Sequence, residues 1–510
     1  MMDEREQVVV IGTGFGGLAA AVRLRAMGYS VLMVEARDQP GGRAGVFRRD
    51  GYIFDAGPTV ITAPYLFEEL FELVGRKLDD YAEFVPIDPY YRITFSDGMA
   101  FDYVGDEKRL IDEVRRFNPE DVDGYRRLAA HAEQIFELGY EELADEPFES
   151  LVDMLRLVPS MIRLQNYRSV YGLVSRYISD ERLRRVFSFQ PLLVGGNPCT
   201  VTSIYLLIHW VERKWGVHFS LGGTTRLVRA LTELLDELGV QIRYGTTVDE
   251  IVVKNESVQA VRTAQGEEIP CQFVVCNGDP TYTYRHLVGT EKCSVNSDRR
   301  LSRIQQSMGL FVGYFATDRS YDSIAHHTIV MGERYRGLLS DIFEKKVLAD
   351  DFSLYLHRPT ATDRSMAPEG HDVFYVLSPV PNNESDIDWT RRGGEYFQQI
   401  LRHLEERHLP GLSDHLTTRF WTSPDYFENS LRSTSGAGFG PEPKLRQSAW
   451  FRYHNRSRDV DGLYFVGAGV HPGAGLPGVV TSAKVLEKLV PIPRENERID
   501  IPPVTARVSV

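Results

Sequence analysis

The residue types best suited to binding chemistry lie in a glycine-rich loop close to the start of the chain. The apolar run Gln7–Ile11 (QVVVI) is typical of a buried parallel strand, and it leads directly into the loop 12–17, which reads GTGFGG. Residues 18–27 have helical composition, and the segment 29–35 (YSVLMVE) has the pattern of a second strand that ends in an acid. Together these four elements predict a dinucleotide-binding unit.

Each glycine of this GxGxxG motif has a separate role in such a unit. Gly12 permits a tight turn, Gly14 lets the backbone approach a pyrophosphate, and Gly17 allows the helix to pack closely on the strand. The N-terminus of the helix then faces the phosphates. Glu35 follows Gly17 by eighteen residues, and its carboxylate is placed to accept hydrogen bonds from a ribose diol and to repel a 2′-phosphate. The other candidate binding residues around this motif are Phe15, Gly16 and Ala36.

A second glycine-rich loop lies near the other end of the chain, where residues 466–485 read VGAGVHPGAGLPGVVTSAKV. Residues 463–466 have the pattern of a buried strand, Gly467 and Gly469 turn the chain tightly, and Pro477 with Gly478 opens a helix. Proline is well tolerated there because its missing N–H would be unpaired at a helix start. His471 is the conspicuous ionisable side chain of this loop. Two interpretations of it stay open: a catalytic residue, or a residue whose hydrogen bonds stabilise the loop.

Length and composition restrict the class of protein. At 510 residues the chain is too long for one compact core, so two domains are expected. The net charge of −13 argues against a general nucleic-acid binder. The four cysteines show no metal-ligand spacing and no disulfide pattern, so we expect no metal site and a reducing compartment. The first residues carry no apolar signal-peptide core, which predicts a cytoplasmic protein.

The segment 186–211 contains no Asp, Glu, Lys or Arg and is long enough to raise the question of a transmembrane helix. Its middle is interrupted by Gly195-Gly196-Asn197-Pro198, which serves a continuous span poorly. We therefore expect two shorter elements that line an apolar cavity.

The pattern along the rest of the chain indicates a discontinuous cofactor domain formed by residues 1–104, 215–300 and 446–492. Its middle part contains a helical stripe over 221–239, a hairpin that turns at Asn255 and the buried-strand run Phe273–Cys276. Two aromatic-rich insertions, 105–214 and 301–445, are expected to form a second domain for substrate and membrane. Residues 493–510 are assigned to a tail.

Residues 151–190 carry seven arginines against three acids, a local net charge of +4 in an acidic chain. Apolar and tyrosine side chains are interleaved with these arginines. Such a basic amphipathic region can lie in an anionic membrane interface, or it can be a solvated helical face packed on the cofactor domain.

Beyond Glu35 the sequence continues with Pro40-Gly41-Gly42-Arg43 and then with GYIFDAGPT over 51–59. The order GxGxxG, acid, GGR, strand and DAGP resembles the FAD-binding start of the flavoprotein amine oxidase and carotenoid desaturase superfamily. The resemblance implies that Gly42 and Arg43 approach the FAD phosphates. It also implies that Gly57, Pro58 and Thr59 lie near the flavin, and that the backbone at Val248 borders the adenosine half.

The C-terminal region gives a more specific resemblance. The strings QSAWFRYHNR over 447–456, GLYFVGAGVHPGAGLPGV and SAK closely resemble the C-terminal signature of bacterial-type phytoene desaturases. Tyr453 and Val470 depart from that pattern, replacing a common proline and a common threonine, and near the start of the chain Ala63 stands where several members of the family carry an acid proposed to act in catalysis. If that acid is required, this protein supplies another group or does without it.

The resemblance implies an α/β fold with a Rossmann-like FAD-binding domain of the glutathione-reductase and amine-oxidase type, and an inserted α+β domain. The late loop would then hold the flavin end of FAD through Gly467, Gly469, Leu476, Pro477, Gly478 and Val479. The positive end of the following helix would face the flavin carbonyl where negative charge gathers on reduction.

The implied activity is an FAD-dependent oxidoreductase that introduces C=C bonds into a long polyisoprenoid, with hydride leaving an allylic carbon for the flavin. The substrate would be lipid-soluble and C40 phytoene-like, which favours monotopic attachment to the membrane. Electrons would pass to quinone or oxygen, because no second nucleotide motif is present.

Alternatives within this enzyme class are a C30 diapophytoene desaturase, a carotene isomerase and a ketolase. An amine oxidase shares the cofactor domain but is expected to carry a different C-terminal signature. A prenyl-binding escort protein on the same fold would perform no chemistry and would not take up FAD.

Overall fold

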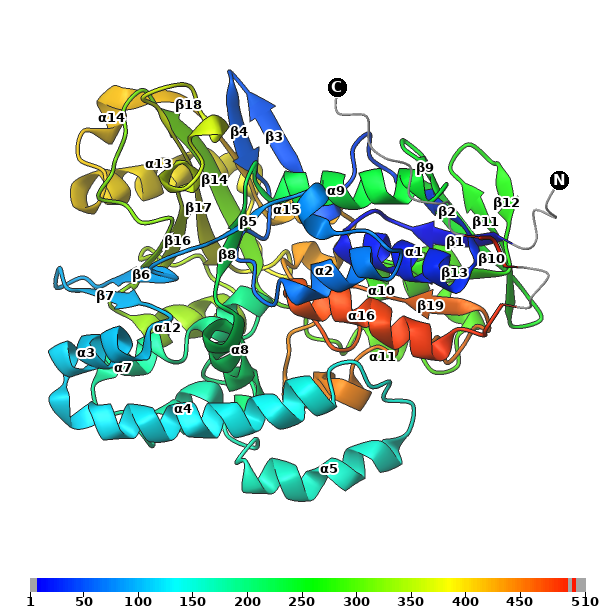
Figure 1. Cartoon of the computed structure of the whole chain (residues 1–510), viewed down its shortest axis with the longest axis horizontal. Coiled ribbons are helices and arrows are strands. Elements are labelled where there is room, and N and C mark those ends of the chain that lie inside the picture. Colours follow the sequence, from blue (N-terminus) through cyan, green and yellow to red (C-terminus); the bar gives the residue numbers. More distant parts are fainter. Residues whose placement is uncertain (1–6, 494–497, 501–510) are drawn as a thin grey trace.

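The computed structural model describes residues 7–493 and 498–500 and contains two main sheets. The first is a parallel five-stranded sheet in the order β19-β13-β1-β2-β9 (Figure 1). Its strands are β1 (Gln7–Ile11), β2 (Ser30–Val34), β9 (Gln241–Arg243), β13 (Phe273–Cys276) and β19 (Leu463–Phe465). The strands come from the start, the middle and the end of the chain, as expected for a discontinuous cofactor domain.

Alternating side chains of β1 pack into two different cores, one on each face of this sheet. Val8 and Val10 pack in the core shared with α1 (Phe15–Met27), α9 (Thr224–Glu237) and α16 (Leu476–Leu489). Val9 points to the opposite face, in the core beneath an antiparallel three-stranded sheet. The strands of that small sheet are β10 (Val248–Lys254), β11 (Ser257–Thr263) and β12 (Glu268–Pro270).

The second main sheet has seven strands in the order β18-β14-β17-β16-β15-β6-β7 and occupies the left of Figure 1. The strands are β6 (Tyr91–Thr94), β7 (Ala100–Tyr103), β14 (Gly309–Thr317), β15 (His327–Val330), β16 (Leu354–His357), β17 (Asp372–Val380) and β18 (Leu416–Thr422). Helix α13 (Trp389–Arg407) covers one face through an aromatic core around Phe311 and Phe397. The other face of the sheet borders the cavity described below.

Helices from the first insertion form the lower part of the molecule in Figure 1, with α4 and α5 along its edge. They are α3 (Glu107–Phe117), α4 (Val122–Phe136), α5 (Leu151–Arg163), α6 (Val170–Val174), α7 (Glu181–Val186) and α8 (Leu207–Trp215). The remaining elements are α2 (Tyr65–Glu72), β3 (Val46–Arg49), β4 (Tyr52–Asp55), β5 (Phe84–Pro86), β8 (His218–Ser220), α10 (Pro280–Tyr282), α11 (Asp298–Leu301), α12 (Tyr335–Ser340), α14 (Leu412–His415) and α15 (Pro424–Asn429). Within the described part of the chain, no helix has both the length and the apolar character needed to cross a membrane.

Most predicted elements are confirmed, with shifted ends. The helix expected at 18–27 begins at Phe15, and the late helix expected to open at Pro477 and Gly478 begins at Leu476. The segment 186–211 is broken into short 3₁₀ turns at Gln190–Val194 and Ser203–Leu206 before α8, which confirms two separate elements in place of a span.

The predicted domain boundary at residue 104 needs correction. Strands β6 and β7 lie within residues 1–104, yet β6 pairs with β15 and belongs to the seven-stranded sheet. Local composition could not reveal this, because the pairing joins strands from distant parts of the chain. We therefore propose that the second domain begins just before Tyr91. Most of the predicted tail 493–510 lies outside the described residues.

Candidate active site

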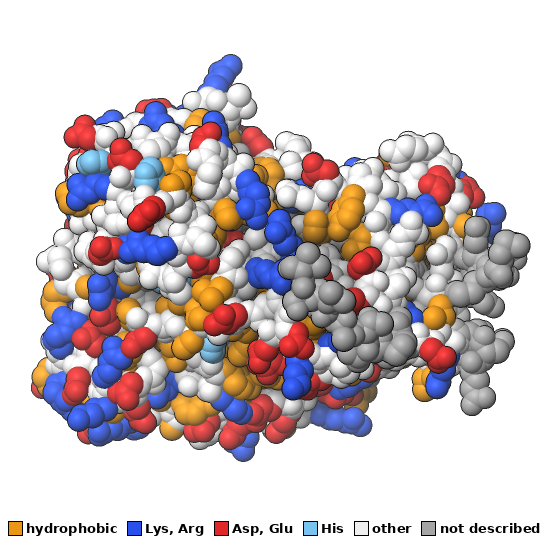
Figure 2. Space-filling model, turned by 45° about the horizontal axis from the view of Figure 1, so that its top comes forward, with side chains coloured by type: hydrophobic (Ala, Val, Ile, Leu, Met, Phe, Trp, Pro, Cys, Tyr) orange, Lys and Arg blue, Asp and Glu red, His pale blue; other side chains and the backbone are white. Residues whose placement is uncertain are grey.

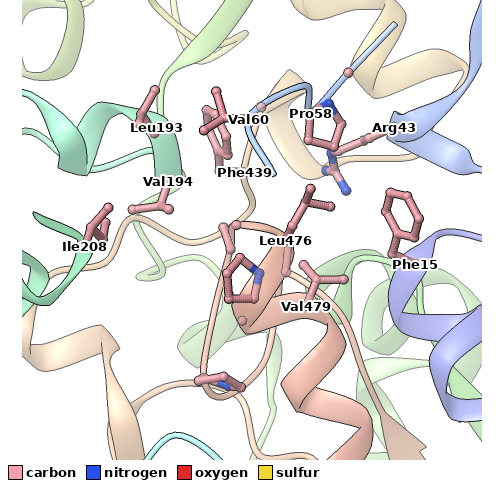
Figure 3. A pocket seen from close by; sticks show the side chains of 18 of the residues that line it. Phe15, Arg43, Pro58, Val60, Leu193, Val194, Ile208, Phe439, Leu476 and Val479 are labelled. Carbon is pink, nitrogen blue, oxygen red and sulfur yellow. The ribbon is translucent and has the colours of Figure 1, made fainter. Parts of the chain in front are cut away.

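A cavity of about 600 Å³ lies between the two main sheets. Both glycine-rich loops border it at one end, and side chains of the insertions border it at the other. In Figure 3, Phe15, Arg43 and Pro58 lie on one side of this cavity, while Leu193, Val194 and Ile208 lie across from them. Leu476 and Val479, at the start of α16, lie between the two groups.

The first glycine loop contributes its backbone to the cavity. Gly12, Gly14 and Phe15 line it, and Gly14 is the residue that precedes the first turn of α1. Gly12 has a φ of +90°, a conformation that favours glycine. A Cβ on Gly17 would lie 2.1 Å from the Gly12 carbonyl oxygen, so Gly17 packs within the loop and does not reach the cavity. The N-terminus of α1 therefore borders the cavity, which suits a pyrophosphate.

Asn277 joins the two glycine loops. A Cβ on Gly14 would lie 2.8 Å from its Nδ2 atom, and a Cβ on Gly467 would lie 2.5 Å from its Oδ1 atom. Asn277 lines the cavity and directly follows β13. No sequence motif marked it as a binding residue. Its position in a turn immediately after a buried parallel strand was the available signal, since ligands gather at the carboxyl ends of such strands.

Glu35 lines the cavity and is buried. Its Oε2 atom accepts hydrogen bonds from the Thr13 N–H at 2.9 Å and from the Thr13 hydroxyl at 2.6 Å. Its Oε1 atom accepts from the Arg37 N–H at 3.0 Å. The carboxylate is thus held rigidly at the end of β2, and Ala36 beside it also lines the cavity. Val248, in contrast, is buried at the start of β10 and is not among the lining residues.

Arg43 is a half-buried cation on the cavity wall. Its Nη2 atom donates to the Ser433 hydroxyl at 2.8 Å, and its Nε atom has no partner among the described residues. Burial lowers the pKa of the guanidinium, while the charge of Asp279 acts in the opposite direction. A guanidinium whose buried N–H has no partner calls for an anionic ligand.

The GGR and DAGP segments are packed directly together. A Cβ on Gly57 would lie 1.8 Å from the Arg43 carbonyl oxygen, and Gly42 has a φ of +54°. Pro58 and Thr59 continue along the cavity wall. The unpaired Arg43 N–H, the rigid carboxylate of Glu35 and the glycine cradle together fit the phosphates, ribose and adjoining ring system of FAD.

The late loop forms the other side of the same cradle. Leu476, Pro477, Gly478 and Val479 line the cavity at the start of α16. Gly467 and Gly469 do not line it: Gly467 packs on Asn277, and a Cβ on Gly469 would lie 2.3 Å from the Cδ atom of Pro280. These two glycines therefore shape the loop from behind.

Arg452 holds the late loop in place and was not given a role by the sequence analysis. It is buried, and it donates to the carbonyl oxygens of Ala468 at 2.6 Å and Val470 at 3.0 Å. The guanidinium thus supplies hydrogen-bond donors to backbone carbonyl oxygens that would otherwise be buried without a partner.

His471 lines the cavity and is buried in the late loop. Its Nε2 atom lies 3.1 Å from the Leu143 carbonyl oxygen, and its ring meets Phe148 with centroids 4.8 Å apart. Burial lowers the pKa of His471 to about 4, so the ring is neutral near pH 7 and Nε2 carries the donated proton. The geometry thus gives His471 a contact that ties the late loop to the first insertion.

The cavity wall away from the glycine loops is largely apolar. The segment 186–211 contributes Phe189, Leu192, Leu193, Val194, Thr202, Ile204, Tyr205, Leu207, Ile208 and Val211. This confirms the prediction that its elements line an apolar cavity. Ala63 is buried and is not among the lining residues, so it supplies no ionisable group to this space.

Glu212 is a carboxyl group in this apolar wall that the sequence analysis missed. The Tyr91 hydroxyl donates to its Oε1 atom at 2.7 Å, and its Oε2 atom has no partner among the described residues. Burial raises the pKa of Glu212 to about 8, so the group is mainly a neutral acid at pH 7. Its place beside arginine in the run WVERKW gave no signal of burial.

The chain matches the family described as flavin containing amine oxidoreductase over residues 15–485. A lycopene-forming phytoene desaturase of Pseudescherichia vulneris is 47% identical to it, covering 95% of this chain and 99% of the relative. A neurosporene-forming phytoene desaturase of Rhodobacter capsulatus is 42% identical, covering 95% and 94%. A 4,4′-diapophytoene desaturase of Methylomonas is 30% identical, covering 96% of each.

Solved structures confirm the fold class. A putrescine oxidase variant has a TM-score of 0.64 at 14% identity, covering 95% of this chain and 97% of the other. Cyclohexylamine oxidase from Brevibacterium oxydans has a TM-score of 0.62 at 17% identity, covering 95% and 99%. At these identities the likeness is one of fold: an FAD-binding domain with an inserted second domain.

Proposed function

Because this chain belongs to the bacterial phytoene desaturase family within the flavin-containing amine oxidoreductases, and is an FAD-dependent oxidoreductase acting on CH–CH bonds, we propose that its substrate is C40 phytoene. The lycopene- and neurosporene-forming relatives are 47% and 42% identical, against 30% for the diapophytoene desaturase. That difference favours the C40 substrate over the C30 one.

The observation that carries this proposal is the construction of the cavity. One end is a glycine cradle bordered by Glu35 and Arg43, and the other end is an apolar wall without a charged partner for an amine. Glu212, the carboxyl group of that wall, is mainly neutral at pH 7 because of its raised pKa. Such a space suits a hydrocarbon chain better than a charged substrate.

FAD, when bound, supplies the hydride acceptor for the reaction. We propose that Glu35 holds its ribose, that Arg43 and the N-terminus of α1 hold its phosphates, and that Leu476–Val479 border its flavin end. The late helix α16 begins at this loop, so its positive end stabilises negative charge that develops there. That the backbone at Val248 borders the adenosine half stays a prediction, since Val248 does not line the cavity.

The apolar wall of the cavity positions the substrate. It excludes water and aligns two neighbouring C–H bonds of the polyene with the cofactor end of the cavity. Loss of the allylic hydride leaves a cation that the growing polyene delocalises, so proton loss does not need a strong base. This agrees with an alanine at position 63 and with a neutral Glu212.

Production of coloured carotenoid in cells that accumulate one precursor tests the substrate. We expect consumption of phytoene with a C40 polyene product, identified by absorption and mass, and little conversion of diapophytoene. A Gly14→Val variant is the matched inactive control, because even a Cβ there would lie 2.8 Å from Asn277. Preferential conversion of diapophytoene would reverse the assignment, and failure to consume either precursor would contradict it.

The surface around α5 supports a further proposal, peripheral attachment to the membrane. Large apolar side chains are unusually exposed along α5 and just after it: Leu151, Val152, Leu155, Val158, Ile162 and Tyr167. Phe451 is exposed in the short helix Ala449–Phe451, which packs against α5. The face in Figure 2, by comparison, intermixes acidic and basic side chains with small apolar groups. An exposed apolar helix of this kind fits the lipid interface.

Part of the positive charge of 151–190 is used in ion pairs, and part remains available to this surface. Arg156 pairs with Asp153, Arg182 with Asp97 and Asp180, and Arg184 and Arg185 with Glu181, whereas within the described part of the chain Arg163, Arg168 and Arg176 form no ion pair with a carboxylate. A second set of arginines lines a hollow that also contains Leu445 and Phe451, and within the described part of the chain none of them forms an ion pair with a carboxylate: Arg299, Arg300, Arg303, Arg446 and Arg458. These cations beside an exposed apolar helix suit anionic lipid headgroups.

We also propose that the reduced cofactor passes its electrons to a quinone or to oxygen. A quinone would reach the protein from the same lipid that supplies the substrate. Turnover in phytoene-loaded liposomes without oxygen, with and without an added quinone, separates the two acceptors. Turnover that requires a nicotinamide nucleotide instead would contradict the proposal.

A further inference from the structure

Three histidines are buried together behind the wall of the cavity. His327 and His357 are direct partners in the antiparallel pair β15–β16, so their side chains lie on the same face of the sheet. His326 immediately precedes β15, and its ring turns to the same cluster. One ligand atom from each of the three lies within 4.8 Å of the others, and all three side chains are buried.

The hydrogen bonds of two of these rings leave one nitrogen available. The Nδ1 atom of His326 lies 2.6 Å from the Thr362 hydroxyl, and the Nδ1 atom of His327 lies 2.7 Å from the Tyr355 hydroxyl. The Nε2 atom of each ring has no partner among the described residues. A histidine whose Nδ1–H is bound by an outer group presents the lone pair of Nε2, which is the arrangement found around metal-ligating histidines.

His357 lies beside a carboxylate that also lacks a partner. Its Nε2 atom is 4.0 Å from the Oδ2 atom of Asp55, and neither of these two atoms meets hydrogen-bond geometry with another described residue. The other oxygen of Asp55 accepts from the Thr224 N–H at 3.0 Å. The neighbouring cation Arg358 does not serve Asp55, because it pairs with Asp322 and Asp372. Buried polar atoms without partners are rare in folded proteins, and here several of them converge.

We propose that His326, His327, His357 and Asp55 bind one divalent transition-metal ion of the zinc class. Zn²⁺ takes imidazole nitrogen at about 2.0–2.1 Å and carboxylate oxygen at a similar distance, in tetrahedral geometry. The three ring centroids are 4.5, 4.9 and 5.4 Å apart. Rings that share a tetrahedral ion have centroids roughly 5 Å apart by these bond lengths, so small ring rotations complete the site. The ion supplies the positive charge that the buried carboxylate lacks.

The site is connected to the cavity wall through Tyr355. The Tyr355 hydroxyl lies 2.9 Å from the Thr59 hydroxyl, which in turn lies 2.7 Å from the Tyr375 hydroxyl. All three of these residues line the cavity. An ion on His327 therefore fixes the orientation of Tyr355 and joins β4, β15 and β16 behind the substrate space.

Metal content of the FAD-loaded, untagged protein tests the site directly. Elemental analysis after growth with added Zn²⁺ is expected to give about one ion per chain for the wild type. We expect His357→Gln and Asp55→Asn each to lower that content at least about tenfold. His403→Gln is the matched control: it removes a histidine of α13 whose Nε2 atom also lacks a partner, and it is expected to leave the content unchanged.

A second measurement does not depend on the folding of variants. The wild-type ion is removed with dipicolinate and replaced by Co²⁺, which is expected to give the ligand-field absorption of tetrahedral Co²⁺ at wavelengths beyond the flavin bands. Its titration is expected to end near one ion per chain. Less than about a tenth of an ion per chain in the Zn²⁺-supplied wild type, with no Co²⁺ band, would overturn the proposal. That result would leave a proton shared between Asp55 and His357 as the explanation of the cluster.

Discussion

Gly16, in the first turn of α1, and Gly467, in the loop after β19, touch through their backbones although they come from opposite ends of the chain. A Cβ atom on Gly16 would lie 2.9 Å from the Gly467 nitrogen and 2.5 Å from the Oδ1 atom of Asn277. The two glycine loops are therefore two sides of one cofactor cradle. The close approach of three separate chain segments accounts for the glycine at position 16, while Gly467 also has a φ of +95°, a conformation that favours glycine.

Gly16→Ala is expected to open this cradle. The new methyl group meets backbone atoms that cannot move without separating α1 from the late loop, and overpacking of this kind costs about 1–3 kcal/mol. We expect FAD affinity to fall about ten- to a hundredfold, measured by flavin titration of the apoprotein. Gly394→Ala in α13 is the control, because its Cβ would meet its nearest neighbour, Trp421, at an ordinary 3.5 Å. Unchanged FAD affinity in Gly16→Ala would contradict the contact.

Glu35→Gln tests the carboxylate at the end of β2. Both oxygens of Glu35 accept backbone N–H groups, from Thr13 and from Arg37, so the NH₂ group of glutamine must face one of these donors. The unmatched donor costs about 1–3 kcal/mol, and we expect a comparable loss of FAD affinity. Asp249→Asn, which neutralises an exposed acid on β10, serves as the control for net charge. Equal FAD affinity in the two variants would contradict a role for Glu35 in binding FAD.

Sequence alone could predict the cofactor half of this molecule in detail because its signals are local. The motif around Gly12, the acid at Glu35 and the helix opened by Pro477 each depend on a few neighbouring residues, and the structure places all three at the cavity. The FAD assignment and the family followed from long strings of this kind.

The parts that were missed depend on long-range pairing. Strand β6 joins β15, and His327 meets His357 only because two strands pair in register. Glu212 lies in a run of charged residues on α8, so only the packing of Tyr91 against it reveals that it is buried. Neither periodicity nor spacing carries such information, and the histidine cluster was therefore absent from the predicted sites.

The exposed apolar face of α5 predicts binding to anionic vesicles. Leu155 and Ile162 are each 61% exposed, and inserting such side chains into lipid contributes about 1.5–3 kcal/mol each. The double variant Leu155→Glu, Ile162→Glu is expected to bind these vesicles with at least about tenfold lower affinity, measured by co-sedimentation at low salt. Val347→Glu, at a side chain that is 47% exposed outside this helix, is expected to bind like the wild type. Wild-type protein that does not bind anionic vesicles at low salt would rule out this surface.

His471→Ala separates a loop contact from a catalytic role. The neutral ring donates to the Leu143 carbonyl oxygen, and losing a buried bond of this type costs about 1–3 kcal/mol. We expect a lower melting temperature, while turnover per bound FAD stays within about twofold of the wild type because the lowered pKa makes the ring a weak base. An unchanged melting temperature with turnover abolished would instead make His471 the catalytic residue.

Glu212 makes the stability of the fold depend on pH in an unusual direction. Burial raises its folded-state pKa from the ordinary 4.5 to about 8. The groups that face it are the hydroxyls of Tyr91 and Tyr103 and the amide of Gln190, and none of these carries a charge at neutral pH. Between these two pKa values the folded chain holds a proton that the unfolded chain has released.

The contribution of Glu212 is therefore complete below about pH 4.5 and is lost as the pH rises toward 8. Within that window the slope is about 1.4 kcal/mol of lost stability per pH unit. Glu212→Gln keeps a neutral side chain at every pH. The variant is therefore expected to lose about that much of the pH dependence of the free energy of unfolding, measured by urea unfolding from pH 5 to 9. Glu369→Gln, at an exposed carboxyl group, is expected to keep the wild-type slope. If Glu212→Gln also keeps the wild-type pH dependence, the Glu212 carboxyl group is ionised in the folded protein and the cavity wall carries a charge.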